Sequence, residues 1–232
     1  TPSIKSDVAF ASGVKELYPS SFALLVGTHP SARPEETLGY SSKIDAVALG
    51  EYDNIVLELA NAIKDGTAID EVRGLCINGK DACKRTALMP AMRELDEIPF
   101  ASEFIHKYLD PRDYFFAAAT YPSIQIFTTR GCPFRCNFCV YPQTMHGHAF
   151  RTRSAESIVS EFEYIANNFP EVKEVVIEDD TFTANKKRVL EVCNLLVERK
   201  LNKRLRWLCN ARVNLDLEAM KAMKKAGCRL II

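Results

Sequence analysis

The sequence predicts an α/β protein whose strands pair in parallel. Short apolar runs, expected of strands buried on both faces, alternate along the 232 residues with longer segments of helical periodicity. Residues that favour the starts and ends of helices separate these segments. Repeated strand–helix units of this length build either a parallel sheet or a (β/α) barrel.

The first part of the chain, up to about residue 98, opens with two predicted strands. Residues 22–26 form an apolar run that ends at Gly27, and residues 44–49 form a second run followed by Gly50. Between them, Pro34 and two glutamates predict the start of a short helix, because proline and acidic residues favour the first helical turn.

A longer helix is expected after the second strand. Asp53 can cap this helix and Gly66 marks its end. Asn78-Gly79 then predicts a turn, within a small hairpin beyond the main sheet. The helical side chains expected to face inward are Ile55, Leu57, Leu59, Ala60 and Ile63.

The stretch from residue 84 to residue 121 is predicted to be a linker. Prolines at positions 90, 99 and 111 interrupt its charged and aromatic pieces, and proline breaks helices and central strands. We therefore expect a domain boundary in this region.

The second part predicts four strands, over residues 124–128, 175–177, 206–209 and 228–232, with helices between them. Ser154 can cap the first helix, Asp216 can cap the third, and Gly227 ends the third. Only four strands fit here, whereas a closed (β/α) barrel needs about 200 residues or more. The chain is therefore expected to be a fragment. The apolar positions of the first two helices are Ile158, Phe162, Ile165, Phe169, Val189, Val192, Cys193 and Leu196.

Three cysteines follow the strand at residues 124–128. Cys132, Cys136 and Cys139 have the spacing C-x3-C-x2-C, and thiolates are the usual ligands of iron–sulfur clusters. Three cysteines can bind three irons of a cubane cluster and leave the fourth iron open. A structural zinc site that recruits His146 or His148 is an alternative, and a disulfide with one free thiol is another.

The loop Thr129-Arg-Gly-Cys-Pro-Phe-Arg-Cys-Asn-Phe-Cys139 closely resembles the signature loop of the radical S-adenosylmethionine superfamily. The resemblance implies a [4Fe–4S] cluster whose open iron binds S-adenosylmethionine, and an external electron donor that reduces the cluster. Cleavage of S-adenosylmethionine then yields a deoxyadenosyl radical. The resemblance also implies that Phe138, just before the last cysteine, contacts adenine.

Charged residues follow the next two strands. Family members hold the amino group of S-adenosylmethionine at the first of these strand ends, and the resemblance assigns this contact to Glu178 or Asp180 within Glu-Asp-Asp. The alternative is an acidic cluster that stabilises a helix N-terminus. Arg212, after the third strand, could bind the methionine carboxylate in bidentate fashion, or pair with Asp216 at the surface.

The N-terminal segment resembles the later half of a cobalamin-binding domain. Leu24-Leu-Val-Gly27-Thr28-His29-Pro30 and Ile44-Asp-Ala-Val-Ala-Leu-Gly50-Glu51 carry this resemblance, and Thr1-Pro2-Ser3 resembles the loop after the preceding strand. It implies that Ser3, Gly27, Thr28 and Gly50 lie near the ligand. An ordinary Rossmann-like domain without a ligand is the alternative.

Together the resemblances imply a partial doubly wound, Rossmann-like cobalamin-binding domain over residues 1–98 and a linker over 99–121. A partial (β/α) radical S-adenosylmethionine barrel over 122–232 follows. Cobalamin-dependent members of this superfamily include methylases and enzymes that form tetrapyrrole rings. The expected function is therefore methyl transfer or ring formation on a small organic substrate. A radical methylthiotransferase and a zinc-stabilised binding module are the alternatives.

Composition narrows the class of partner and the compartment. Lys plus Arg and Asp plus Glu both total 30, so the net charge of zero gives no basic surface for nucleic acid. No apolar run is long enough to span a bilayer, and no signal peptide opens the sequence. Five scattered cysteines and three clustered ones favour reduced thiols in the cytoplasm.

Overall fold

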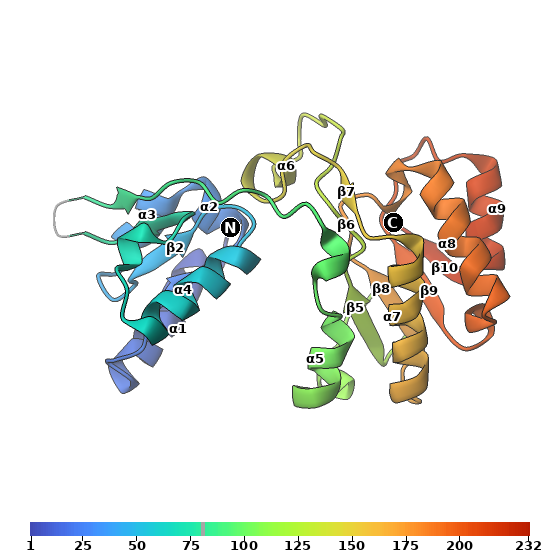
Figure 1. Ribbon diagram of the computed structural model, residues 1–232, viewed down its shortest axis with the longest axis horizontal. Coiled ribbons are helices and arrows are strands. Elements are labelled where there is room, and N and C mark those ends of the chain that lie inside the picture. The colour runs from blue at the N-terminus through green and yellow to red at the C-terminus, as the bar shows by residue number, and fades with distance from the viewer. Residues whose placement is uncertain (80–81) are drawn as a thin grey trace. The chain divides into compact units, whose positions relative to one another are not determined.

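The computed structural model describes residues 1–79 and 82–232, and it is a mixed α/β structure with parallel strand pairing, which confirms the predicted fold class (Figure 1). The chain packs as two compact units. The first comprises Thr1–Met92 and Phe134–His148, and the second comprises Arg93–Pro133 and Ala149–Ile232. The domain boundaries placed at residues 98 and 121 stay a prediction.

The first unit contains a four-stranded sheet in the order β1-β2-β3-β4. Strands β1 (Leu24–Leu25) and β2 (Ala46–Ala48) are parallel, whereas β3 (Leu75–Ile77) and β4 (Lys84–Arg85) join antiparallel. The β3–β4 pair is the hairpin expected around Asn78-Gly79, and part of its turn lies outside the described residues. Its expected place beyond the main sheet is wrong, because β3 pairs with β2 inside the sheet.

Helices cover both faces of this sheet. Because side chains alternate along β2 and β3, Val47 and Cys76 pack on one face while Ala46 and Leu75 pack on the other. Helix α4 supplies the second face, and α1 and α3 supply the first. The helices of this unit are α1 (Ile4–Leu17), α2 (Thr28–Ala32), α3 (Pro34–Gly39), α4 (Asp53–Asp65) and α6 (Tyr141–Thr144).

The inward face predicted for α4 is partly wrong. Ile55 and Leu59 are buried, but Leu57 and Ile63 are 59% and 49% exposed. The buried stripe is completed by Ala62 rather than Ala60, because residues three and four apart share a helix face. The predicted end of the helix is confirmed, since Gly66 adopts the left-handed conformation with φ 69°.

The second unit is built on a parallel sheet in the order β10-β9-β8-β5. Its strands are β5 (Ser123–Ile126), β8 (Glu174–Ile177), β9 (Arg206–Cys209) and β10 (Cys228–Ile231), in agreement with all four predicted strands. A short antiparallel pair, β6 (Thr129–Arg130) with β7 (Arg151–Thr152), lies next to the cysteine loop in sequence.

Helices α7 (Ala155–Asn168), α8 (Lys186–Glu198) and α9 (Leu217–Lys225) lie side by side along this sheet (Figure 1). Two of the predicted caps are confirmed: the Ser154 hydroxyl accepts from the Ser157 N–H at 3.1 Å, and Asp216 accepts from the Ala219 N–H at 3.1 Å. The cap predicted at Asp53 is wrong, because Asp53 is the first residue inside α4 and Tyr52 takes the N-cap position. All eight apolar positions predicted for the first two helices are buried in one core with Trp207.

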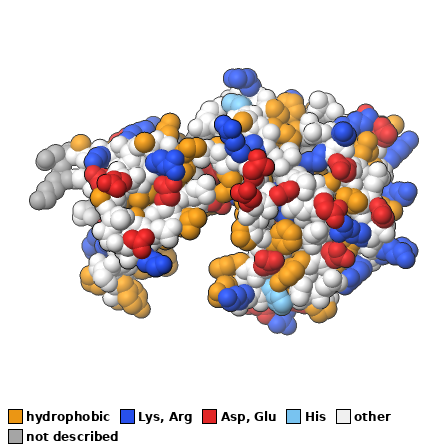
Figure 2. Space-filling model, viewed as in Figure 1, with side chains coloured by type: hydrophobic (Ala, Val, Ile, Leu, Met, Phe, Trp, Pro, Cys, Tyr) orange, Lys and Arg blue, Asp and Glu red, His pale blue; other side chains and the backbone are white. Residues whose placement is uncertain are grey.

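The predicted linker contains a helix, α5 (Ala101–Tyr108), which packs on β5 and α7. Short 3-10 helices complete the described residues: η1 (Ile69–Glu71), η2 (Leu95–Glu97), η3 (Pro111–Asp113), η4 (Phe182–Ala184) and η5 (Leu201–Lys203). Among the described residues, no helix has the length and apolar character needed to cross a membrane. Acidic and basic side chains are interspersed on the face shown in Figure 2.

Candidate functional site

The strands of the second unit end level with one another. Ile126 pairs with Ile177 across β5 and β8, and Ile177 pairs with Cys209 across β8 and β9. The segments that follow these strands therefore leave the sheet at its carboxyl edge, where parallel α/β folds bind ligands. These segments carry the cysteine loop, Glu178-Asp-Asp180, and Asn210 to Arg212.

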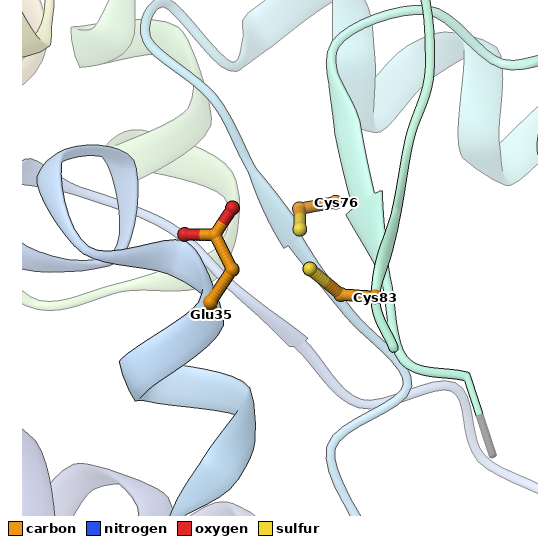
Figure 3. Close-up of side chains that lie close together, drawn as sticks. All are labelled: Glu35, Cys76 and Cys83. Atoms are coloured by element: carbon orange, nitrogen blue, oxygen red, sulfur yellow. The ribbon is translucent and has the colours of Figure 1, made fainter. Parts of the chain in front are cut away.

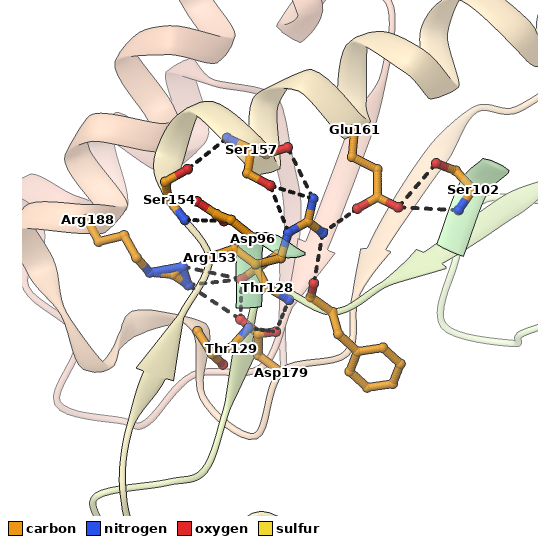
Figure 4. A network of polar contacts seen from close by, with 11 residues as sticks. Asp96, Ser102, Thr128, Thr129, Arg153, Ser154, Ser157, Glu161, Asp179 and Arg188 are labelled. Atoms are coloured by element: carbon orange, nitrogen blue, oxygen red, sulfur yellow. Dashed lines mark hydrogen bonds and ion pairs between the residues drawn. The ribbon is translucent and has the colours of Figure 1, made fainter. Parts of the chain in front are cut away.

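Asp179 fixes the segment that leads into the cysteine loop. Its carboxylate accepts from the N–H groups of Thr128 and Thr129 at 2.7 and 2.9 Å, and also from the Thr128 hydroxyl. The buried Arg188 guanidinium lies 3.5 Å from this carboxylate and donates to the Thr128 hydroxyl at 2.9 Å (Figure 4). Asp179 is thus occupied by the protein itself, which leaves Glu178 and Asp180 as the acidic candidates for a ligand.

A second buried network holds the same segment from the other side. Arg153 forms an ion pair with Glu161 and donates to the Phe127 carbonyl at 3.1 Å, while its backbone N–H donates to the Thr128 carbonyl. Glu161 also accepts from the Ser102 hydroxyl at 3.1 Å (Figure 4). Because both charges are buried and paired, Arg153 is a positioning residue, and the sequence alone had assigned it no role.

The cysteine loop begins at Gly131, whose φ of 81° favours glycine. Cys132, Cys136 and Cys139 are all half-buried and none of them is in a disulfide, and the Cys139 N–H closes a turn onto the Cys136 carbonyl at 3.1 Å. Phe138 is 88% exposed. Three partly accessible thiols in one loop at a strand end are a donor set that suits an iron–sulfur cluster.

Glu178 is half-buried, and burial raises the pKa of its carboxyl group, with repulsion from Asp179 acting in the same direction. A raised pKa means that the folded protein disfavours the charged form, and a bound cationic group would relieve this penalty. Nearby, the hydroxyls of Thr129 and Thr181 are buried and make no hydrogen bond within the described part of the chain. These groups fit a polar ligand at this edge.

The loop after β9 is held by Asn210. Its side-chain amide donates to the Asp179 carbonyl at 3.1 Å, and its own carbonyl accepts from the Phe182 N–H at 3.0 Å. Arg212 is exposed at the end of this loop. Asp216 pairs with Lys186 at 2.9 Å.

In the first unit, Gly27 and Gly50 follow the two parallel strands β1 and β2. Both have positive φ angles, 110° and 82°, that side chains rarely adopt. A Cβ added to Gly27 would meet nothing within 4 Å, so the space beside it is open. Thr28 begins α2, and Ser3 precedes α1, where its side chain makes no capping hydrogen bond. Open space beside Gly27, at the end of a strand, is compatible with a bound nucleotide-like tail.

The residues that follow the last cysteine pack within this first unit. Helix α6 packs on α2, and the Met145 carbonyl lies 3.4 Å from the position that a Cβ on Gly50 would take. Ser31 on α2 ties these loops together, because its hydroxyl accepts from the Gly50 N–H at 3.0 Å. No sequence pattern predicted α6, which is a single helical turn.

Comparison with known proteins finds a family match in the second half of the chain. Residues 126–232 match the model of the radical SAM superfamily. The chain is 31% identical over 218 residues to an uncharacterized methyltransferase of Pyrococcus horikoshii, an alignment that covers 94% of this chain and 46% of that protein. It is 27% identical over 239 residues to the anaerobic magnesium-protoporphyrin IX monomethyl ester cyclase of Cereibacter sphaeroides, covering 98% of the chain and 37% of the relative.

Solved structures share the fold. The cobalamin-dependent S-adenosylmethionine radical enzyme OxsB, with aqua-cobalamin and S-adenosylmethionine bound, superposes with a TM-score of 0.73 at 18% identity, over 96% of this chain and 32% of OxsB. The methyltransferase TsrM of Kitasatospora setae, with cobalamin and a [4Fe–4S] cluster bound, gives 0.72 at 20% identity, over 99% and 44%. The chain spans less than half the length of each of these relatives.

Proposed function

We propose, from the membership of residues 126–232 in the radical SAM superfamily, that this chain is part of a cobalamin-dependent radical S-adenosylmethionine enzyme. The single observation that carries the proposal is the C-x3-C-x2-C loop, whose three half-buried cysteines, none in a disulfide, follow the first strand of a parallel sheet. The relatives named above, a methyltransferase and a ring-forming cyclase, support the same class.

Cys132, Cys136 and Cys139 would hold a [4Fe–4S] cluster. Such a cluster, when reduced, supplies the electron that splits S-adenosylmethionine into methionine and a deoxyadenosyl radical. The chain's own contribution is to position the loop. Asp179 and Arg153 anchor residues 127–129 to neighbouring elements, so the thiols start from a fixed point.

S-adenosylmethionine would be bound by side chains at the same carboxyl edge. Glu178 or Asp180 would take the amino group, because a cation offsets the unfavourable charge of Glu178. Arg212 would bind the carboxylate, and the exposed ring of Phe138 would contact adenine. Asp179 is not assigned this role, because its carboxylate already accepts three hydrogen bonds from Thr128 and Thr129.

Cobalamin would lie against the strand-end loops of the first unit, near Ser3, Gly27, Thr28 and Gly50. Bound cobalamin supplies a transferable methyl group or a redox-active cobalt. The open space beside Gly27 supports this placement, and Thr28 follows it as the first residue of α2. In addition, helix α6 packs on α2, which connects the segment after Cys139 to the loops that would hold cobalamin.

The reaction would be methyl transfer or ring formation on a small organic substrate, with an external electron donor. The cytoplasm suits this chemistry, because its reducing conditions keep cysteines available as cluster ligands. The structural alternative, a zinc-stabilised module, differs in its metal content and in its failure to consume S-adenosylmethionine.

The test uses the intact protein, made anaerobically with ample cobalamin. Cleavage of S-adenosylmethionine to deoxyadenosine by the reduced protein, with bound cobalamin, is the expected result. Cleavage without any cobalamin would remove cobalamin from the proposal, and stoichiometric zinc without cleavage would contradict it entirely.

A variant tests the cobalamin site. Thr28→Trp adds bulk at the first residue of α2 and should lower cobalamin occupancy while the iron content stays unchanged. Gly27 itself is a poor position for this test. Its φ of 110° and ψ of −170° form a glycine-only conformation, in which even the alanine side chain of Gly27→Ala costs about 1–3 kcal/mol. Unchanged cobalamin content in Thr28→Trp would place the ligand elsewhere.

A further inference from the structure

A second group of metal-ligating side chains lies in the first unit, away from the cysteine loop in sequence. Glu35 in the first turn of α3, Cys76 on β3 and Cys83 just before β4 present their ligand atoms to one another, all within 4.8 Å (Figure 3). Among the described residues this is the one group of three or more His, Cys, Asp or Glu ligands that are so close together.

We propose that Glu35, Cys76 and Cys83 form a binding site for a divalent, thiolate-preferring metal ion such as Zn²⁺, with water as the fourth ligand. A tetrahedral zinc ion has Zn–S distances of about 2.3 Å, which separate two thiolate sulfurs by about 3.8 Å. The observed separations are close enough that small side-chain rotations would bring the three ligands onto one ion.

The charge of the surroundings fits such an ion. Arg85 on β4 donates from Nε and Nη2 to Glu35 Oε1, at 2.8 and 2.5 Å, and this leaves Oε2 for a metal. Two thiolates and the carboxylate bring three negative charges, and Arg85 brings one positive charge. A divalent cation cancels the remainder, and the bonds from Arg85 orient the carboxylate as supporting residues do in metal sites.

One side of this group of ligands is buried and the other side is open to solvent, which suits a metal ion. Cys76 is fully buried in a core with Val47 and Leu38, whereas Cys83 is half-buried and the Glu35 side chain is 54% exposed. The ion would therefore rest against apolar side chains on one side and reach solvent on the other. By linking α3 to the β3–β4 hairpin, it would stabilise the first unit.

Buried cysteines near one another do not by themselves make a metal site, and the second unit provides an example. Cys193, Cys209 and Cys228 lie in the apolar core of the second unit, and their sulfur atoms do not all lie within 4.8 Å of one another. What distinguishes Cys76 and Cys83 is a carboxylate oriented by an arginine at the protein surface.

The test uses the full chain with Cys132, Cys136 and Cys139 replaced by alanine, so that its outcome is independent of the proposed cluster. Co²⁺ is added to the reduced, metal-free protein as a probe for the zinc site. Tetrahedral thiolate coordination should appear as thiolate-to-cobalt charge-transfer absorption that saturates at about one Co²⁺ per chain and is displaced by Zn²⁺.

Variants in the same background identify the ligands. Cys83→Ser should abolish the charge-transfer absorption, and Glu35→Gln should weaken Co²⁺ binding about 10-fold or more. Glu36→Gln, on the next residue of α3, and Cys193→Ser are the matched controls and should bind as the background does. Cys76→Ser is less informative because Cys76 is in the core.

Two results would overturn the proposal. One is a background protein that gives no charge-transfer absorption with Co²⁺, or gives the same absorption after Cys83→Ser. The other is a Cys76–Cys83 disulfide in air, detected by mass spectrometry of the joined peptides, in a protein that binds no Co²⁺ after reduction.

Discussion

At the scale of single residues, Asp179 illustrates how a site residue can act through the backbone. Asp179→Asn keeps the shape of the side chain but leaves the guanidinium of Arg188 buried without its counter-charge. Breaking a buried ion pair in this way costs about 3–5 kcal/mol. We expect this loss of unfolding free energy in urea, monitored by Trp207, the single tryptophan, which is buried in the second unit.

Asp110→Asn is the matched control for this prediction. Asp110 pairs with Arg112 at the surface of the same unit, where its side chain is 37% exposed. Exposed pairs contribute little to stability, so this variant should unfold close to the parent protein. Equal unfolding midpoints for the two variants would show that Asp179 does not anchor the loop.

Glu178 makes a prediction about pH. Its folded-state pKa is raised, mainly by burial, so the folded protein holds the proton more tightly than the unfolded chain. The unfolding free energy therefore carries no penalty from Glu178 below the ordinary pKa of 4.5, and the penalty develops as pH rises through the folded-state value. Glu178→Gln should match the parent protein at low pH and become the more stable of the two at higher pH.

The same variant should weaken binding of S-adenosylmethionine if Glu178 takes the amino group. Glu191→Gln, on the exposed face of α8, is the control and should change neither quantity. A Glu178→Gln protein whose stability relative to the parent is independent of pH would contradict the burial argument.

At the scale of elements, the caps at Ser154 and Asp216 were predictable from sequence because they depend on local chemistry alone. The Ser154 hydroxyl caps α7, so Ser154→Ala should lower the unfolding free energy by about 0.5–2 kcal/mol. Ser160→Ala, within the same helix, should be neutral or slightly stabilising because alanine favours helix interiors. Urea unfolding followed by Trp207 fluorescence measures both, and a larger loss for Ser160→Ala would disprove the assignment of the cap.

The elements that were missed have features that hide them from pattern analysis. Helix α2 spans five residues and contains Pro30 in its first turn, where proline is tolerated. Helix α5 lies between Pro99 and Pro111, buries Ser102 rather than an apolar stripe, and exposes Phe104 and Tyr108. The strands β1 and β2 are shorter than their apolar runs, since only part of each run pairs.

At the scale of the whole molecule, the cysteine loop and its place after a strand were predictable, because cysteine spacing and strand punctuation are local signals. The two networks that hold the loop were not. Asp179 binds Thr128 across about 50 positions of sequence, and Arg188 binds it across about 60, so only the packing of parallel strands brings them together. The group of Glu35, Cys76 and Cys83 is joined by the fold in the same way.

The most direct test of the central claim is the iron content of the anaerobically reconstituted protein. About four irons and four sulfides per chain are expected, and each of Cys132→Ala, Cys136→Ala and Cys139→Ala should lose the cluster. Cys193→Ala and Cys209→Ala, which change buried core cysteines, should retain it. Full iron retention in a variant lacking all three loop cysteines would contradict the assignment.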